Sequence, residues 1–317
     1  MREGGGGGPA RGRGAGRPGG RVARARGSPG GGRGAGAPRG GRDGVPARTW
    51  RRGVVIAARA FPDSLPLAVR GAREAAGRLL EDGGLLLEVE IPASAINSVP
   101  GDGEGANEMT ASGQQALEFA LGLWRGSEAE RLRVFFPDEG EMKLAAGDAE
   151  GWPAAGFRLD YLTRPTVLLD VGLDILKTPI AERCQQDDAA FICPYPSFNV
   201  NEILAVRELS DTVAAAAKKP IVVFNGEIER LRSGYYPGVF YPKLARLSKE
   251  WLPGFEAAYY LRNFKGSRPG ALFRAYPGPW QVWSRSPGDP GDMRLLHEQS
   301  DVLSLREAAE ILQSGRT

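Results

Sequence analysis

Three apolar runs of the chain each end in a short polar sequence whose side chains could bind a ligand or move a proton. These side chains are Asp138 and Glu139, then Ser197 and Asn199, and finally Asn225 and Glu227. If the runs are neighbouring strands of a parallel sheet, the side chains meet at its carboxyl edge, where open α/β sheets bind ligands. Carboxylates and amides gathered there could hold a cation or a polar ligand, or raise the pKa of one carboxylate for acid-base work.

Helix capping explains some of the same residues without any ligand. Asp138 and Asn199 stand where N-caps belong, and Glu139 suits the first turn of a helix through the helix dipole. Both interpretations of this strand-end cluster stay open from the sequence.

The sequence signatures of familiar catalytic sites are missing. The chain has no G-x-x-x-x-G-K-[ST] phosphate loop, no G-x-G-x-x-G after a strand and no G-x-S-x-G elbow. His297 is the single histidine, which excludes sites with several histidine ligands, and we expect it to be structural. We therefore expect a protein that is not an enzyme and holds no cofactor or metal. The alternative is an enzyme or a small-ligand-binding α/β protein that uses the strand-end cluster.

The segments that position these residues alternate between strand and helix. The apolar runs predict strands at 85–91, 131–136, 166–171, 189–193 and 221–224, and helical spacing predicts helices at 64–83, 107–124, 199–217 and 239–251. Strands that are apolar on both faces, separated by long helices, favour a parallel sheet covered on both sides. We expect Ser64 to begin the first of these helices, and Asn199 with Glu202 to form a capping box in the third.

The last third of the chain has a different pattern. Short stretches at 256–264, 271–276 and 280–285 alternate, and the turn-rich loop 265–270 favours an antiparallel hairpin between the first two. Ser304 with Glu307 predicts a capping box for a final helix that ends near residue 313. The fold class expected is therefore α/β, a mostly parallel sheet flanked by helices with an antiparallel C-terminal extension. It forms one domain over residues 60–317.

Aromatic residues are concentrated in the C-terminal region: 13 of the 26 lie between Gly234 and Trp283. Aromatics that alternate along a strand fill a core, but Tyr, Trp and Arg are also the types that dominate protein interfaces. Both uses stay open, and we expect the loop 265–270 to be exposed. The candidate surface for a partner or ligand comprises Asn199, Asn225, Glu227, Arg232, Tyr235, Tyr236, Arg262, Lys265, Arg274 and Trp280.

The first 52 residues differ in composition from the rest. They contain 13 Arg and 19 Gly with one Asp and one Glu, so they contribute +11 to a net charge of +3 and leave −8 for the remainder. Such a segment is not expected to fold. An Arg-rich, acid-poor N-terminus is typical of an organelle transit peptide, here residues 1–55, with processing near residues 54–60. The alternative is an RNA-binding Arg-Gly tail, although Trp50 is its only aromatic residue.

No apolar run reaches the length that a membrane span needs. Cys184 and Cys193 are too few for a secreted disulfide framework, and they are interpreted as two free thiols or as a redox-sensitive bridge.

Several segments resemble a known family. YPSFNVNEIL, IVVFNGEIERLRSGYYPGVFYPKLA, YYLRNFKG, LFRAYPGPWQVW and SLREAAEIL are similar to the plastid Low Photosystem II Accumulation family, in particular to a stromal assembly factor. It belongs to a wider group defined only as a domain of unknown function. The resemblance is dense over residues 189–283, looser over 85–170, and absent from the leader.

This resemblance implies a chloroplast protein of the stroma that associates with the thylakoid, peripherally if it meets the membrane at all. The implied chaperone-like role is to help the inner-antenna chlorophyll protein join photosystem II. The implied partners are that subunit and another photosystem II assembly factor, with no nucleic acid. The resemblance implies no catalytic residues.

Overall fold

The computed structural model of the protein describes residues 61–99, 105–164, 178–196, 200–233, 238–239, 241–286 and 288–315. All of them fall in the unit that runs from Val54 to Thr317. Several sequence predictions lie outside the described residues: the leader 1–55, the strand 166–171, and the side chains of Ser197, Asn199, Tyr235 and Tyr236.

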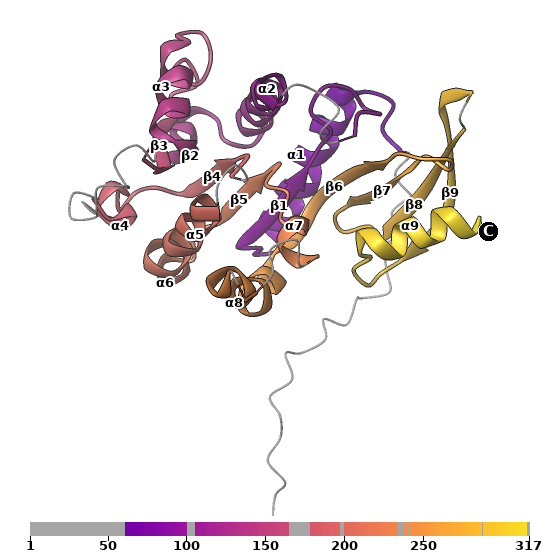
Figure 1. Cartoon of the computed structure of the whole chain (residues 1–317). Helices are drawn as coiled ribbons and strands as arrows, with labels where there is room; N and C mark the ends of the chain where they lie inside the picture. The colour runs from indigo at the N-terminus through magenta and orange to yellow at the C-terminus, as the bar shows by residue number, and fades with distance from the viewer. Residues whose placement is uncertain are drawn as a thin grey trace, which may run out of the picture. The chain divides into compact units, whose positions relative to one another are not determined.

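The described residues form a nine-stranded sheet with the order β3-β2-β4-β5-β1-β6-β7-β8-β9 (Figure 1). The strands are β1 (Leu86–Glu90), β2 (Leu132–Asp138), β3 (Arg158–Thr163), β4 (Ala190–Pro194), β5 (Ile221–Phe224), β6 (Glu256–Phe264), β7 (Gly270–Ala275), β8 (Trp280–Ser286) and β9 (Asp289–Gln299).

The strand pairing changes from parallel to antiparallel at β6. From β3 to β6 every neighbouring pair is parallel, with Leu86 opposite Ile221 and Leu87 opposite Glu256. From β6 to β9 every pair is antiparallel, with Tyr260 opposite Arg274. This confirms the expected α/β class, a mostly parallel sheet with an antiparallel C-terminal part.

Helices cover both faces of the sheet, and Figure 1 shows α2 and α3 on one side with α5 and α8 on the other. The α-helices are α1 (Leu65–Glu81), α2 (Gly105–Leu123), α3 (Glu139–Gly147), α4 (Ile180–Arg183), α5 (Val200–Leu209), α6 (Ala215–Ala217), α7 (Glu229–Arg232), α8 (Pro242–Glu250) and α9 (Leu305–Ser314). Short 3₁₀ segments at Gly126–Arg131 and Leu252–Gly254 and a π-helical turn at Ser210–Ala214 complete the set.

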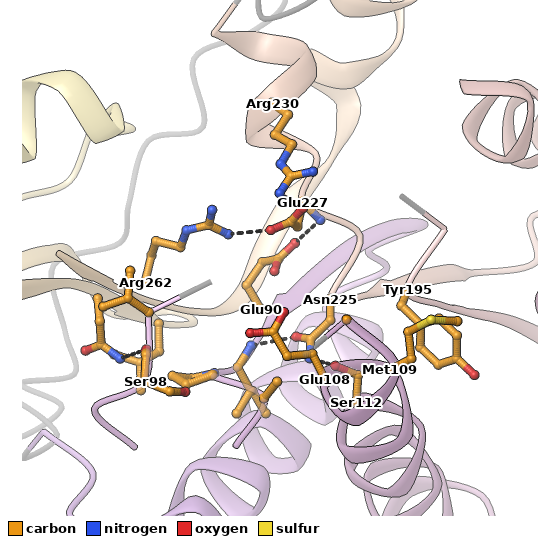
Figure 2. Close-up of a pocket in the computed structure, with 17 residues that line it drawn as sticks. Glu90, Ser98, Glu108, Met109, Ser112, Tyr195, Asn225, Glu227, Arg230 and Arg262 are labelled. Atoms are coloured by element: carbon orange, nitrogen blue, oxygen red, sulfur yellow. Dashed lines mark hydrogen bonds and ion pairs between the residues drawn. The ribbon is translucent and has the colours of Figure 1, made fainter. Parts of the chain in front are cut away.

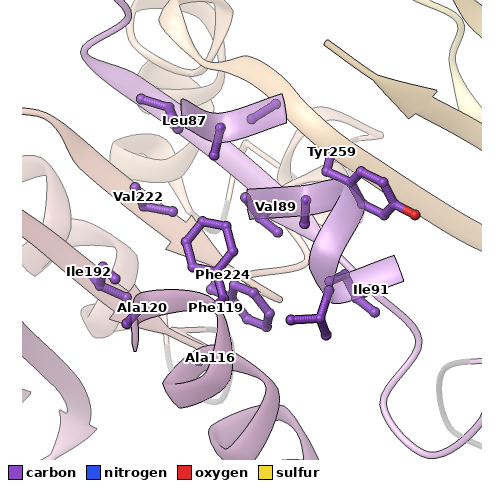
Figure 3. Close-up of a cluster of buried hydrophobic side chains, with 14 of the residues drawn as sticks. Leu87, Val89, Ile91, Ala116, Phe119, Ala120, Ile192, Val222, Phe224 and Tyr259 are labelled. Atoms are coloured by element: carbon purple, nitrogen blue, oxygen red, sulfur yellow. The ribbon is translucent and has the colours of Figure 1, made fainter. Parts of the chain in front are cut away.

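The largest core lies between the sheet and the helices α1 and α2 (Figure 3). Phe119 of α2 packs against Phe224 of β5 with ring centroids 5.3 Å apart, and Leu87 and Val89 of β1 are fully buried beside them. Because side chains alternate along a strand, the residues between them face the other side. On β1 those residues are two glutamates, Glu88 and Glu90.

The helix ends agree with the sequence predictions to different degrees. Ser304 and Glu307 form the predicted capping box at the start of α9. Ser64 occupies the N-cap of α1, but its side chain makes no capping hydrogen bond. The helix expected over 199–217 is interrupted by the π-helical turn, where the Trp251 indole donates to Ser210 Oγ at 3.3 Å.

Two strands were not predicted from the sequence, and both lie at edges of the sheet. β3 carries Asp160, which is buried because Arg133 and Arg183 pair with it. β9 is mostly polar and is held by its pairing with β8. Neither strand contains a run of apolar residues, which is the pattern from which the other strands of the parallel part were predicted.

Candidate functional site

A pocket of about 270 Å³ lies at the carboxyl ends of the adjacent strands β5 and β1. The chain leaves β1 toward α2, which covers one face of the sheet, and leaves β5 toward α7 and α8, which cover the other. The connections that follow these two neighbouring strands therefore lead to opposite faces of the sheet. Where they separate, a crevice opens, and this is where α/β sheets bind ligands. Strand ends supply polar groups to the pocket, while α2 and β6 close its sides (Figure 2).

Asn225 joins three elements at the base of the pocket. Its Oδ1 accepts a hydrogen bond of 2.8 Å from the backbone N–H of Ile91, and its Nδ2 donates to Ser112 Oγ of α2 at 3.0 Å. The side chain is almost fully buried and its amide is satisfied on both sides. Asn225 therefore fixes the positions of β5, β1 and α2 relative to one another.

Left-handed backbone is concentrated around the same pocket. Four of the described residues other than glycine have a positive φ, in the left-handed part of the Ramachandran plot. Three of them line the pocket: Tyr195, Asn225 and Glu227. The fourth, Lys218, ends α6. Such conformations cost free energy and persist where the surrounding structure enforces them, which is common at binding sites.

Glu227 organises the charged wall of the pocket. Its carboxylate pairs with Arg230 at 2.7 Å and with Arg262 of β6 at 3.3 Å, and its backbone N–H donates to Glu90 Oε1 at 2.6 Å. Figure 2 shows Glu227 flanked by the two arginines, with Glu90 beside it. Both guanidinium groups are therefore already engaged by one carboxylate.

Glu90 is the buried acid of this pocket. Its pKa is raised from 4.5 to about 8, mainly by burial and also by the negative charges of Glu88 and Glu227, while Arg262 and the hydrogen bond from Glu227 N act to lower it. Near neutral pH the carboxyl group is therefore largely protonated. A carboxyl group with a pKa near the working pH can bind ligands in either charge state or exchange a proton.

A second buried acid lies on the same face of β1. Glu88 is completely buried and pairs with Arg232 of α7 at 2.7 Å, while its Oε1 has no hydrogen-bond partner. This ion pair fastens α7 to the sheet below the pocket.

The strand-end cluster expected from the sequence is brought together only in part. Asn225 and Glu227 line the pocket, but Asp138 caps α3 by accepting from the backbone N–H of Glu141 at 2.9 Å. Glu139 pairs with Lys143 within α3 at 2.8 Å. The helix-cap interpretation of Asp138 is therefore confirmed.

The C-terminal candidates are also divided. Arg262 lines the pocket and Lys265 is exposed in the predicted loop, but Arg274 and Trp280 are buried. Arg274 pairs with Glu256 at 2.6 Å and lies over the Trp280 ring, which packs against Tyr260. We therefore remove Arg274 and Trp280 from the candidate surface and assign them to the core.

Arg232 has a structural partner as well. Its pairing with fully buried Glu88 stabilises α7 and leaves its side chain one quarter exposed. Among the described residues near the start of α8, Tyr241, at 41% exposure, and Val239, at 89%, are large exposed side chains.

The sequence reasoning missed Glu90, Arg230 and Ser112. Glu90 could have been found, because two glutamates at alternate positions of a strand that is otherwise apolar must be buried or paired. Arg230 could have been inferred from its spacing of three residues after Glu227, with which it pairs. Ser112 carries no such signal, since it reaches the pocket only because α2 packs beside β5.

Cys184 and Cys193 are free thiols in this structure. Burial raises the pKa of Cys184 to about 11 and raises that of Cys193 even further. No group of three or more His, Cys, Asp or Glu among the described residues is arranged to hold a metal ion. Within the described part of the chain, no helix has the length and apolar character required to cross a membrane.

These features define an open α/β sheet protein with helices on both faces and a polar pocket at its carboxyl edge. A family model described as Domain of unknown function (DUF1995) matches residues 62–310, so the chain belongs to that family. No curated protein matches the chain, and no solved structure matches it either.

Proposed function

We propose that the protein is a non-enzymatic assembly factor that assists the biogenesis of photosystem II in plastids. In this role it helps the inner-antenna chlorophyll-binding subunit join the complex. The observation that carries the proposal is the similarity of the segments within residues 189–283 to the Low Photosystem II Accumulation family. Membership of the family that spans residues 62–310 is consistent with it.

The N-terminal composition supports a plastid address. Residues 1–55 have the Arg-rich, acid-poor character of a transit peptide, and we place the mature protein in the stroma at the thylakoid surface. The test is the N-terminus of the protein isolated from cells, which is expected near residues 54–60. A protein that retains the Arg-Gly leader would contradict this and favour the RNA-binding alternative.

The partner is expected to be a photosystem II subunit or another assembly factor. A tagged chain expressed in a plastid-bearing host and purified from thylakoid-associated stroma under mild detergent should recover the inner-antenna subunit. A Tyr241→Ala variant tests the exposed surface at the start of α8, and an Arg246→Ala variant on the same helix is the matched control. Recovery of no photosystem II subunit or assembly factor, with good yield of the tagged chain, would overturn the proposal.

A second candidate function is that of a small-ligand-binding protein or enzyme that uses the pocket between β5 and β1. The connections that leave these two parallel strands toward opposite faces of the sheet, and the left-handed residues around the pocket, favour this candidate. Its test is complementation of a null mutant by a chain carrying Glu227→Gln and Arg262→Gln, two pocket changes that keep the backbone donor to Glu90. Full complementation by a stably folded double variant would count against this candidate.

A further inference from the structure

We propose that the pocket between β5 and β1 binds a primary ammonium group carried on a short aliphatic stem, with the ammonium beside the carboxyl group of Glu90. This inference rests on the second candidate function, ligand binding at the pocket, and names the chemical class of the ligand.

Glu90 is the acceptor that the fold leaves incomplete. Its side chain lines the pocket and the residue is only 5% exposed. Oε1 accepts the 2.6 Å hydrogen bond from Glu227 N, whereas Oε2 accepts no hydrogen bond from any other described residue. This oxygen is open to the pocket, and an ammonium group there can donate a charge-assisted hydrogen bond to it.

The arginines nearby are held by other acids. Arg230 and Arg262 both pair with Glu227, and Arg232 pairs with Glu88. None of the three makes an ion pair with Glu90. An anion in the pocket would have to share guanidinium groups that already pair with an acid, whereas a cation would complete the coordination of Glu90 without competing with any of these pairs.

The charge around Glu90 also favours a cation. Glu88 lies on its own strand, Glu227 and Glu229 lie in or before α7, and Glu108 projects from α2. The bases near these acids are Arg230, Arg232 and Arg262. Tyr260 of β6 also lies nearby and is uncharged, because burial raises the pKa of its hydroxyl group. Of the groups whose charge shifts the pKa of Glu90, the two acids Glu88 and Glu227 exceed the one base, Arg262, even before Glu90 ionises.

The rest of the lining suits an aliphatic stem. Ile91, Val99, Met109 and Leu261 are among the apolar residues that line this pocket of about 270 Å³. Methionine adapts its shape to such chains. An ammonium head with a stem of a few methylene groups combines the two kinds of contact that the pocket offers.

Binding of this ligand is linked to a proton. Because burial and the neighbouring acids raise the pKa of Glu90 to about 8, its carboxyl group is largely protonated at pH 7 when the pocket is empty. A bound ammonium lowers that pKa, so binding at pH 7 releases a proton, and affinity rises as the pH approaches 9. An amine has a pKa near that of lysine, about 10, and stays charged over this range.

Two sources carry this chemistry: a lysine side chain of a polypeptide and a free small amine. Two probes distinguish them in calorimetric titration of the full chain. Nα-acetyl-lysine-methylamide presents the lysine side chain with its backbone, and n-butylamine presents the ammonium and stem alone. Binding of both indicates that a lysine side chain can enter, and binding of n-butylamine alone restricts the site to free amines. Either result supports the proposal.

The variants test the role of Glu90. Glu90→Gln keeps an acceptor for Glu227 N but removes the charge, so n-butylamine should bind about tenfold more weakly or worse, with no proton release. Glu139→Gln, an acid outside the pocket, should bind like the natural protein. If Glu90→Gln does not fold, the test uses Met109→Trp instead. This larger side chain fills the pocket and should abolish binding. Amine binding unchanged by either pocket variant would overturn the proposal.

A third probe separates this inference from the function on which it rests. Glutarate carries two carboxylates on a similar stem. If glutarate binds and the amines do not, the pocket is a ligand site but its ligand class is anionic, and only the present inference fails. If none of the three probes binds at about 10 mM, both the ligand class and ligand binding at this pocket fail.

Discussion

The backbone N–H of Glu227 donates a hydrogen bond of 2.6 Å to the buried carboxyl group of Glu90, and so ties the end of β5 to the end of β1. This bond uses one carboxyl oxygen of Glu90 and leaves the other facing the pocket. It also holds Glu227 in left-handed backbone, from which its side chain reaches Arg230 and Arg262. This one hydrogen bond therefore both holds the ends of β1 and β5 together and positions the charged side chains of the pocket.

Glu90 makes the stability of the protein depend on pH. Its pKa is raised from 4.5 to about 8 on folding, so the folded state binds a proton more strongly than the unfolded state. The stabilisation from Glu90 is therefore complete below about pH 4.5 and is lost as the pH rises toward 8. Within that range the unfolding free energy of the natural protein should fall, relative to Glu90→Gln, by about 1.4 kcal/mol per pH unit. Denaturant titrations at pH 5, 6, 7 and 8 measure the difference, and parallel profiles would contradict it.

Removal of Arg232 should destabilise the protein because it leaves Glu88 buried without a counter-charge. We expect Arg232→Met to cost about 3 to 5 kcal/mol of unfolding free energy. Adding Glu88→Gln to this variant should recover a large part of the loss. The control is Arg246→Met, which removes an exposed pair with Glu250 and should change little. A loss in Arg232→Met no greater than in the control would show that the buried pair does not stabilise α7.

Asn225 should tolerate glycine better than alanine. Both substitutions remove the bonds to Ile91 and Ser112, but only alanine must adopt φ of 51° with a side chain. We expect Asn225→Ala to cost about 2 to 4 kcal/mol and Asn225→Gly to cost about 1 kcal/mol less. Lys218 has the same φ at the end of α6, so Lys218→Ala and Lys218→Gly measure the backbone effect alone. Equal stability of the two Asn225 variants would contradict the backbone argument.

Trp280 should act through stability and not as a contact for a partner. It is buried between Tyr260 and Arg274, so Trp280→Ala should cost about 3 to 5 kcal/mol. Val239→Ala, at a position that is 89% exposed, should leave the thermal unfolding temperature almost unchanged. A Trp280→Ala chain as stable as the natural protein would return this residue to the candidate surface.

The parallel part of the fold was predictable because its strands are buried on both faces. Runs such as Ile221–Phe224 are apolar throughout, and the intervening helices show clear spacing. The edge strands β3 and β9 were missed for the opposite reason. Their polar residues are paired by neighbouring elements, as Asp160 is by Arg133, and local sequence does not contain that information.

The pocket was predictable at the level of strand ends and not at the level of its charges. Asn225 and Glu227 were identified because they end an apolar run. The importance of Glu90 depends on β6 bringing Arg262 beside it and on the turn after β5 supplying the donor. Aromatic composition likewise could not separate buried Trp280 from exposed Tyr241, because both lie in the same dense region of sequence.

The position of β1 in the sheet also governs the order in which the protein can fold. Although it is the first strand of the described residues, its neighbours in the sheet are β5 and β6, as in Leu86 with Ile221 and Leu87 with Glu256. During synthesis β1 therefore has no partner until two thirds of the chain has been made, and contacts this distant in sequence slow folding. Until then Glu88 and Glu90 remain hydrated and ionised, so the same two acids that charge the finished pocket keep an unpaired, otherwise apolar strand soluble.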